Sequence, residues 1–162
     1  HDLWMRDYFQ KELGVTVHHH PITLSVGASR FFIGHGDGLG PGDKGYKRMK
    51  KLFTNPISKW LFRWLHPDWG VRLGQYLSRK NKIISGEEDV KFLGEDKEWL
   101  VAYSKKKLQE EHFDYFVFGH RHLPLEINLS EKSQYINLGD WITHNTYAEY
   151  DGKHLILKNW KK

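Results

Sequence analysis

The sequence contains no cysteine, and this absence excludes several kinds of protein. A scaffold held together by disulfides, a zinc site with thiolate ligands and a cysteine nucleophile are all ruled out. Any metal ion bound by this chain must therefore take His, Asp, Glu or Asn as its ligands. The lack of cysteine is also compatible with a reducing compartment.

Long apolar runs are absent as well. No stretch approaches the roughly 18 apolar residues of a membrane span, so we expect no transmembrane helix. The chain begins at His1 and shows no charged and apolar leader of the kind that forms a signal peptide. With 162 residues, 39% of them hydrophobic and 28% charged, the composition is that of one globular domain with a core of its own.

The net charge of +5 is unevenly distributed along the chain. Residues 43–82 hold eleven Lys and Arg against two Asp, which gives this stretch a net charge of +9 and leaves −4 for the remainder. Seven aromatic residues lie in the same stretch, which we call the basic aromatic segment. This combination suits an anionic amphiphile, an anionic membrane surface or single-stranded nucleic acid, and composition does not choose among them.

The spacing of apolar residues predicts a mixed α/β chain with a helical insertion at residues 44–82. The expected helices span residues 3–13, 44–65 with a break at Asn55-Pro56, about 69–77, and 90–111. The expected strands span residues 15–17, 22–26, 30–33, 115–118, 125–129, 134–138, 146–150 and 154–158. Gly27-Ala28-Ser29 and Asp151-Gly152 are expected to form hairpin turns.

Histidines follow two of the predicted strands. Gly34-His35-Gly36-Asp37 comes after the strand at 30–33, and Gly119-His120-Arg121-His122 comes after the strand at 115–118. Loops that leave the carboxyl ends of strands in an α/β sheet meet at one edge, so the three histidines are expected to lie close together. Imidazole groups gathered there suit a metal site. The alternative is that each histidine only stabilises its own loop by hydrogen bonding.

The two loops resemble the last two motifs of the calcineurin-like metallophosphoesterases. His1-Asp2 resembles the end of a third family motif, Gly-Asn-His-Asp, and two more, Asp-x-His and Gly-Asp-x-x-Asp, would lie upstream of His1. The resemblance implies the C-terminal half of a four-layer αββα sandwich. Residues 1–162 would form this partial domain, and residues 44–82 would form a helical lid insertion within it.

A narrower resemblance begins in the glycine-rich loop after the first of these histidines. Its residues are similar to those of the UDP-2,3-diacylglucosamine hydrolases of lipid A biosynthesis, which are manganese-dependent enzymes. The similar residues are Gly38-Leu39-Gly40-Pro41-Gly42-Asp43, Tyr46, Asn55-Pro56, Leu61-Phe62 and Arg72-Leu73. The family cleaves the pyrophosphate of UDP-2,3-diacylglucosamine to give 2,3-diacylglucosamine 1-phosphate and UMP. The resemblance implies this activity for the complete protein, and an inactive chain where the upstream metal ligands are missing.

The resemblance also implies roles for single residues around two divalent metal ions, expected to be manganese. His35 and His120 would bind one ion and His122 the other. His1 would lie beside the transferring phosphoryl group, and Asp43 would contact the glucosamine head group. Two such ions activate a bridging water for in-line displacement and neutralise charge on the phosphoryl oxygens.

The same resemblance implies a substrate-binding role for the basic aromatic segment. Trp60 and Trp64, together with Leu61, Leu65, Trp69 and Leu73, would line a slot for the acyl chains. Arg72, Arg79, Lys80 and Lys82 would hold the phosphates or meet an anionic bilayer, where each basic residue near the surface contributes ~1 kcal/mol. The alternative is an ordinary apolar core with an ordinary solvated face.

The expected partners are a nucleotide-linked acylated sugar, an anionic membrane surface and the missing N-terminal half of the domain. The expected location is cytoplasmic and peripheral, at the inner face of the cytoplasmic membrane. One alternative is a calcineurin-like phosphoesterase with another substrate. The other is a module without catalysis that binds anionic lipid or nucleic acid, and it leaves the two Gly-His loops unexplained. Nucleic acid is therefore not an expected partner.

Overall fold

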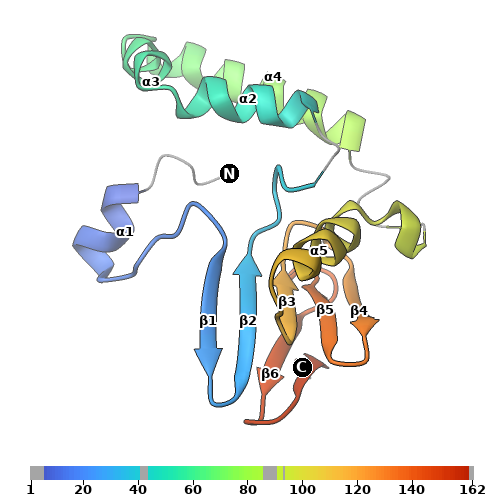
Figure 1. The fold of residues 1–162 in the computed structure, drawn as a ribbon. Helices are drawn as coiled ribbons and strands as arrows, with labels where there is room; N and C mark the ends of the chain where they lie inside the picture. Colours follow the sequence, from blue (N-terminus) through green and yellow to red (C-terminus); the bar gives the residue numbers. More distant parts are fainter. Residues whose placement is uncertain (1–5, 41–43, 86–90, 93, 161–162) are drawn as a thin grey trace. The chain divides into compact units, whose positions relative to one another are not determined.

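The computed structural model describes residues 6–40, 44–85, 91–92 and 94–160 (Figure 1). The chain divides into two compact units. Residues 20–42 and 88–162 form the sheet unit, and residues 1–19 and 43–87 form the helical unit. His1 and Asp43, both expected at the substrate, lie outside the described residues.

A mixed sheet of five strands is the centre of the sheet unit, with the order β1-β2-β3-β5-β4. Its strands are β1 (Ile22–Val26), β2 (Ser29–Gly34), β3 (Tyr115–Phe118), β4 (Pro124–Ser130) and β5 (Ser133–Leu138). β2, β3 and β5 run parallel to one another, and β1 and β4 pair antiparallel at the two edges. The predicted α/β class is therefore confirmed.

The two faces of this sheet are covered by different elements. Successive side chains of a strand point to opposite faces, so Phe32 packs toward α5 (Trp99–Glu110) while Phe31 packs toward a two-stranded hairpin. The hairpin consists of β6 (Thr146–Tyr150) and β7 (Leu155–Asn159). All four residues of β3 are buried because it is covered on both sides.

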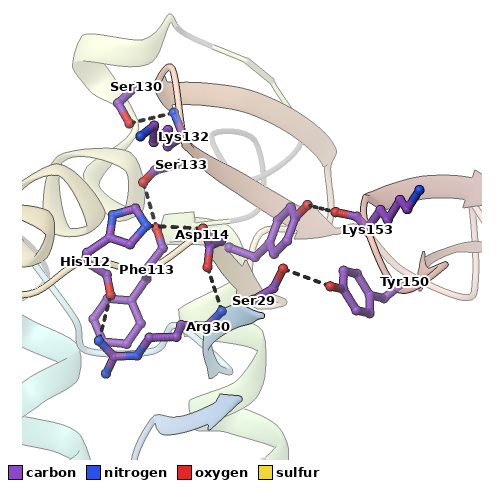
Figure 2. Close-up of polar contacts among 11 residues, drawn as sticks. Ser29, Arg30, His112, Phe113, Asp114, Ser130, Lys132, Ser133, Tyr150 and Lys153 are labelled. Atoms are coloured by element: carbon purple, nitrogen blue, oxygen red, sulfur yellow. Dashed lines mark hydrogen bonds and ion pairs between the residues drawn. The ribbon is translucent and has the colours of Figure 1, made fainter. Parts of the chain in front are cut away.

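Polar contacts at the beginnings of the parallel strands fix their register (Figure 2). The backbone N–H of Arg30 donates to Asp114 Oδ2 at 2.7 Å, and the N–H of Asp114 donates to the carbonyl of Arg30 at 2.9 Å. The Ser133 hydroxyl donates to the carbonyl of Phe113 at 2.7 Å. Because the strands are aligned at their beginnings, the loops that follow β2 and β3 leave the sheet at the same level.

The helical unit contains α1 (Arg6–Leu13), α2 (Lys44–Thr54), α3 (Pro56–Arg63) and α4 (Pro67–Ser85). The break expected at Asn55-Pro56 is confirmed, because the Asn55 side chain accepts a hydrogen bond from the N–H of Ile57 and Pro56 occupies the first turn. Among the residues of this unit that the structure describes, none is buried. No helix in the described part of the chain is both long and apolar enough to span a bilayer.

Several boundaries differ from the sequence prediction. Residues 15–17 form no strand, although their residue types favour one. The helix expected from residue 90 begins only at Trp99, after the short 3-10 helix η1 (Glu95–Lys97). Gly94, with φ of 98°, precedes η1 in a conformation that an α-helix does not accommodate. The helix expected over about residues 69–77 is longer in the structure, where α4 runs from Pro67 to Ser85.

Candidate functional site

Two loops meet at the carboxyl ends of β2 and β3. Gly34 and Phe118 are partners in the parallel register, so His35 and Gly119 each follow the end of a strand at the same level. The N–H of Gly119 donates to the carbonyl of His35 at 3.1 Å, which continues the pairing beyond the last strand residues. This backbone bond places His35 beside His120.

The imidazole rings of His35 and His120 lie close together at this edge of the sheet, nearly perpendicular to each other. Nε2 of His35 lies 3.4 Å from Nδ1 of His120, and the ring centroids are 5.2 Å apart at an angle of 82°. Two imidazole nitrogens bound at about 2.0–2.1 Å to one tetrahedral ion lie ~3.4 Å apart, so the pair fits two positions of a metal's ligand shell. Without an ion, the same separation suits a hydrogen bond between the rings.

Two backbone conformations with positive φ shape these loops. Gly36 has φ of 110°, and a Cβ on it would lie 3.0 Å from Leu100 Cδ1 and 3.3 Å from the Cβ of His120. His120 itself has φ of 45°, in the left-handed region that residues other than glycine seldom adopt. A residue held in such a conformation requires support from its surroundings.

The third predicted ligand, His122, is exposed on the same open groove as the histidine pair. This groove has a volume of about 780 Å³, and His35, His120 and His122 lie on its wall. The remainder of the lining is largely apolar and comes from β1, β2, β3, β6, β7 and the end of β5 with the turn after it, with Leu24, Val26, Ile33, Leu138 and Trp141 among its residues. Within the described residues, no three His, Asp or Glu side chains are gathered closely enough to hold a metal ion.

The predicted substrate-binding residues lie in the helical unit. Trp60 lies on α3 and Trp64 is the C-cap residue of this helix; their ring centroids are 5.8 Å apart, and they are 56% and 75% exposed. Within the described helical unit, the two tryptophans are therefore not part of a buried core. Arg72 and Arg79 are exposed on α4. The helix also includes Lys80 and Lys82, whose side chains lie outside the described structure.

A buried polar network beneath the second loop was not evident from the sequence. Arg121 Nη2 donates to Glu98 Oε1 at 2.9 Å, and the Asn137 side-chain amide donates to the carbonyl of Gly119. The Asn137 amide lies 3.4 Å from the hydroxyl of Tyr135, and burial raises the pKa of that tyrosine to about 12. Glu and Arg usually lie on the surface, so no signal in the sequence distinguishes this pair from solvated charges.

A second polar cluster follows β5. The Asp140 side chain accepts hydrogen bonds from the N–H groups of Ile142 and Thr143, and its other oxygen lies 3.0 Å from His144 Nδ1. The bond from Thr143, followed by that from His144, holds the pKa of Asp140 well below its usual range. Asp140 therefore remains an anion at neutral pH and orders the turn that carries Trp141 along the groove.

Comparisons with known proteins agree with the motifs. No family model matches the chain. A Porphyromonas gingivalis protein named UDP-2,3-diacylglucosamine hydrolase is 36% identical, over 98% of this chain and 65% of its own length. Proteins of the same name from Pseudomonas putida and Vibrio parahaemolyticus are 30% and 26% identical, over 97% and 98% of this chain and 65% of their own length. The resemblance to this group of hydrolases is therefore confirmed, and the chain spans 65% of the length of these relatives.

Proposed function

We propose, because the chain is homologous to proteins named UDP-2,3-diacylglucosamine hydrolase, that the complete protein hydrolyses the pyrophosphate of UDP-2,3-diacylglucosamine in lipid A biosynthesis. The products would be 2,3-diacylglucosamine 1-phosphate and UMP. The observation that carries this proposal is the convergence of His35 and His120, 3.4 Å apart at the ends of two parallel strands. Relatives with the same name match nearly the whole chain, which supports the proposed substrate, and the histidine pair supports the proposed chemistry.

In this proposal the histidines bind two divalent ions, with manganese as the expected metal. His35 and His120 would hold one ion, and His122, on the same groove, would help to hold the other. When bound, such ions supply a polarised water and neutralise charge on the phosphoryl oxygens. His1 would lie beside the phosphoryl group and stabilise its charge or protonate the leaving group, and Asp43 would bind the glucosamine.

The remaining ligands would come from the part of the domain that this chain lacks. The chain spans 65% of the length of its relatives, and the groove beside the histidines is lined by apolar side chains. Leu24 and Val26 of β1 are 45% and 40% exposed there. We propose that the rest of the domain covers this apolar wall and completes a four-layer sandwich. The chain alone would then have no activity.

The basic aromatic segment, in this proposal, forms the lid that binds the acyl chains. Ile57, Trp60 and Leu61 of α3 and its C-cap residue Trp64 follow helical spacing, and each is more than half exposed. Lys59 and Arg63 lie on the same helix and would meet anionic headgroups. Together with Arg72, Arg79, Lys80 and Lys82 they would place the protein at the inner face of the cytoplasmic membrane.

The test is manganese-dependent hydrolysis by the complete protein. We expect His120→Ala and His122→Ala each to remove most activity while the far-UV circular dichroism stays unchanged. His154→Ala is the matched control, because His154 is an exposed histidine of the same unit and its side chain does not line the groove. Near-normal turnover in both groove variants would contradict the metal assignment. Turnover of simple diesters without turnover of the acylated nucleotide would indicate a phosphoesterase with another substrate.

A further inference from the structure

A buried ion pair connects the second histidine loop to the start of α5. Arg121 lies between His120 and His122 in the sequence, and its Nη2 donates to Glu98 Oε1 at 2.9 Å and to the carbonyl of Lys91 at 2.8 Å. Glu98 is 2% exposed and Arg121 is 5% exposed. The loop is thus tied to a residue 23 positions earlier in the chain.

Glu98 stands at the N-terminal end of α5, where its side chain would be expected to cap the helix. Glu98 is the N-cap residue of α5, a position at which a side-chain oxygen commonly accepts a backbone N–H of the first turn. Its carboxylate makes no such capping bond and reaches Arg121 instead. A buried ion pair is often no more stabilising than apolar side chains of the same volume. The geometry that the pair fixes is therefore a separate question from the stability that it contributes.

The next two residues of α5 also contact the histidine loops. The Trp99 ring lies 5.7 Å from the ring of His120, at an angle of 76°. Leu100 fills the space beside Gly36, where a Cβ would lie 3.0 Å from Leu100 Cδ1. Three consecutive residues at the start of one helix therefore contact the loops that carry the histidine pair.

The second loop also requires such support. His120 has φ of 45°, and a residue with a Cβ is strained in this left-handed conformation and stays in it only where the surroundings impose it. The Arg121–Glu98 pair follows this position directly, and the Asn137 amide holds the Gly119 carbonyl just before it. The strained residue is thus fixed on both sides.

We propose that Glu98 is a positioning residue: through Arg121 it holds the Gly119–His122 loop in the conformation that turns His120 toward His35. The proposal rests on the proposed function, because the ring pair is taken to hold a divalent ion. Groups behind metal ligands typically change metal affinity by 10–100-fold when they are altered. Glu98 acts through its contact with Arg121, which lies in the loop that carries His120 and His122.

The experiment compares Glu98→Gln with Glu95→Gln in the complete protein. Glu95 is the matched control because it lies three residues earlier, is exposed and pairs with Lys105 at 3.4 Å. Calorimetric titration with Mn²⁺ should show 10–100-fold weaker binding for Glu98→Gln and unchanged binding for Glu95→Gln. In the metal-free protein, the nuclear Overhauser contact between the His35 and His120 rings should weaken only in Glu98→Gln.

A double variant separates positioning from stability. Glu98→Met combined with Arg121→Met removes both charges and keeps an apolar fill, so we expect it to regain thermal stability but not manganese affinity. If affinity returns with stability, or if Glu98→Gln keeps both the affinity and the ring contact of the parent, the positioning role is wrong. If the parent protein binds no Mn²⁺, the proposed function fails, and the ring contact alone decides the role of Glu98.

Discussion

Leu100 occupies the space that a side chain at Gly36 would need, since a Cβ on Gly36 would lie 3.0 Å from the Leu100 Cδ1 atom. Gly36 also has φ of 110°, where residues with a Cβ are strained. The glycine after His35 thus meets two separate requirements, one of backbone conformation and one of space. The requirement of space arises because Leu100 of α5 packs against the loop after β2.

Gly36→Ala should therefore impair the histidine site as well as the fold. We expect a loss of about 1–2 kcal/mol in the free energy of unfolding from backbone strain alone, together with a fall of at least tenfold in manganese affinity. Denaturant unfolding and metal titration of the complete protein measure the two effects. Gly152→Ala is the control, because Gly152 has φ of 99° with no atom within 4 Å of an added Cβ. Equal manganese affinity in the two variants would contradict this account.

Asn137→Leu should weaken the anchoring of the loop at residues 119–122. Asn137 is fully buried, donates to the Gly119 carbonyl and accepts from the Gly139 N–H at 3.2 Å. The substitution leaves two backbone groups without these partners, at about 1–3 kcal/mol for each that stays buried. Asn128→Leu, at an exposed position of β4, should change the unfolding free energy little. Similar losses in the two variants would show that the amide does not anchor the loop.

Replacement of Trp60 and Trp64 together by Glu tests the acyl-binding role of α3. Both side chains are exposed, so we expect thermal stability to be nearly unchanged. The value of kcat/KM for the acylated substrate should fall at least tenfold, because each buried methylene contributes about 0.8 kcal/mol. Hydrolysis of a small chromogenic diester should stay the same. Tyr8→Glu, also 56% exposed and in the helical unit, is the control. An equal loss on both substrates would argue against an acyl slot.

Tyr135 should make the protein less stable in alkali. Burial raises its pKa to about 12, whereas an unfolded tyrosine titrates near 10. Between these values the folded state holds a proton that the unfolded state has lost, so stability falls as the pH rises, by up to about 2–3 kcal/mol. Urea unfolding at pH 9 and pH 11 should show a smaller decline for Tyr135→Phe than for the parent. Identical declines would mean that Tyr135 ionises in the folded state as it does in the unfolded chain.

The sequence predicted those parts of the fold that depend on local patterns. Tyr115 to Phe118 is a short, wholly apolar run, and it forms the buried central strand. Asp151-Gly152 was expected to turn a hairpin, and Tyr150 pairs with Leu155 across it. The meeting of His35 and His120 was also predicted, because it follows from two strands that end side by side.

The remainder depends on contacts between distant residues. Glu98 and Arg121 are 23 positions apart, and only the packed structure reveals that both are buried. The late start of α5 follows from the conformation of Gly94, which apolar spacing does not reveal. The strand expected at residues 15–17 has suitable residue types but pairs with no strand in the described part of the chain, and a strand depends on such pairing.

The pairing of β2 with β3 has a consequence for how the chain tolerates change in length. Arg30 and Asp114 are joined at the beginnings of these strands although they are 84 positions apart. The entropy of closing a loop grows only logarithmically, so doubling its length costs about 0.6 kcal/mol. Lengthening or shortening the basic aromatic segment should therefore change the stability of the sheet little. The helices within this connection can therefore differ in length while His35 and His120 stay paired at the ends of β2 and β3.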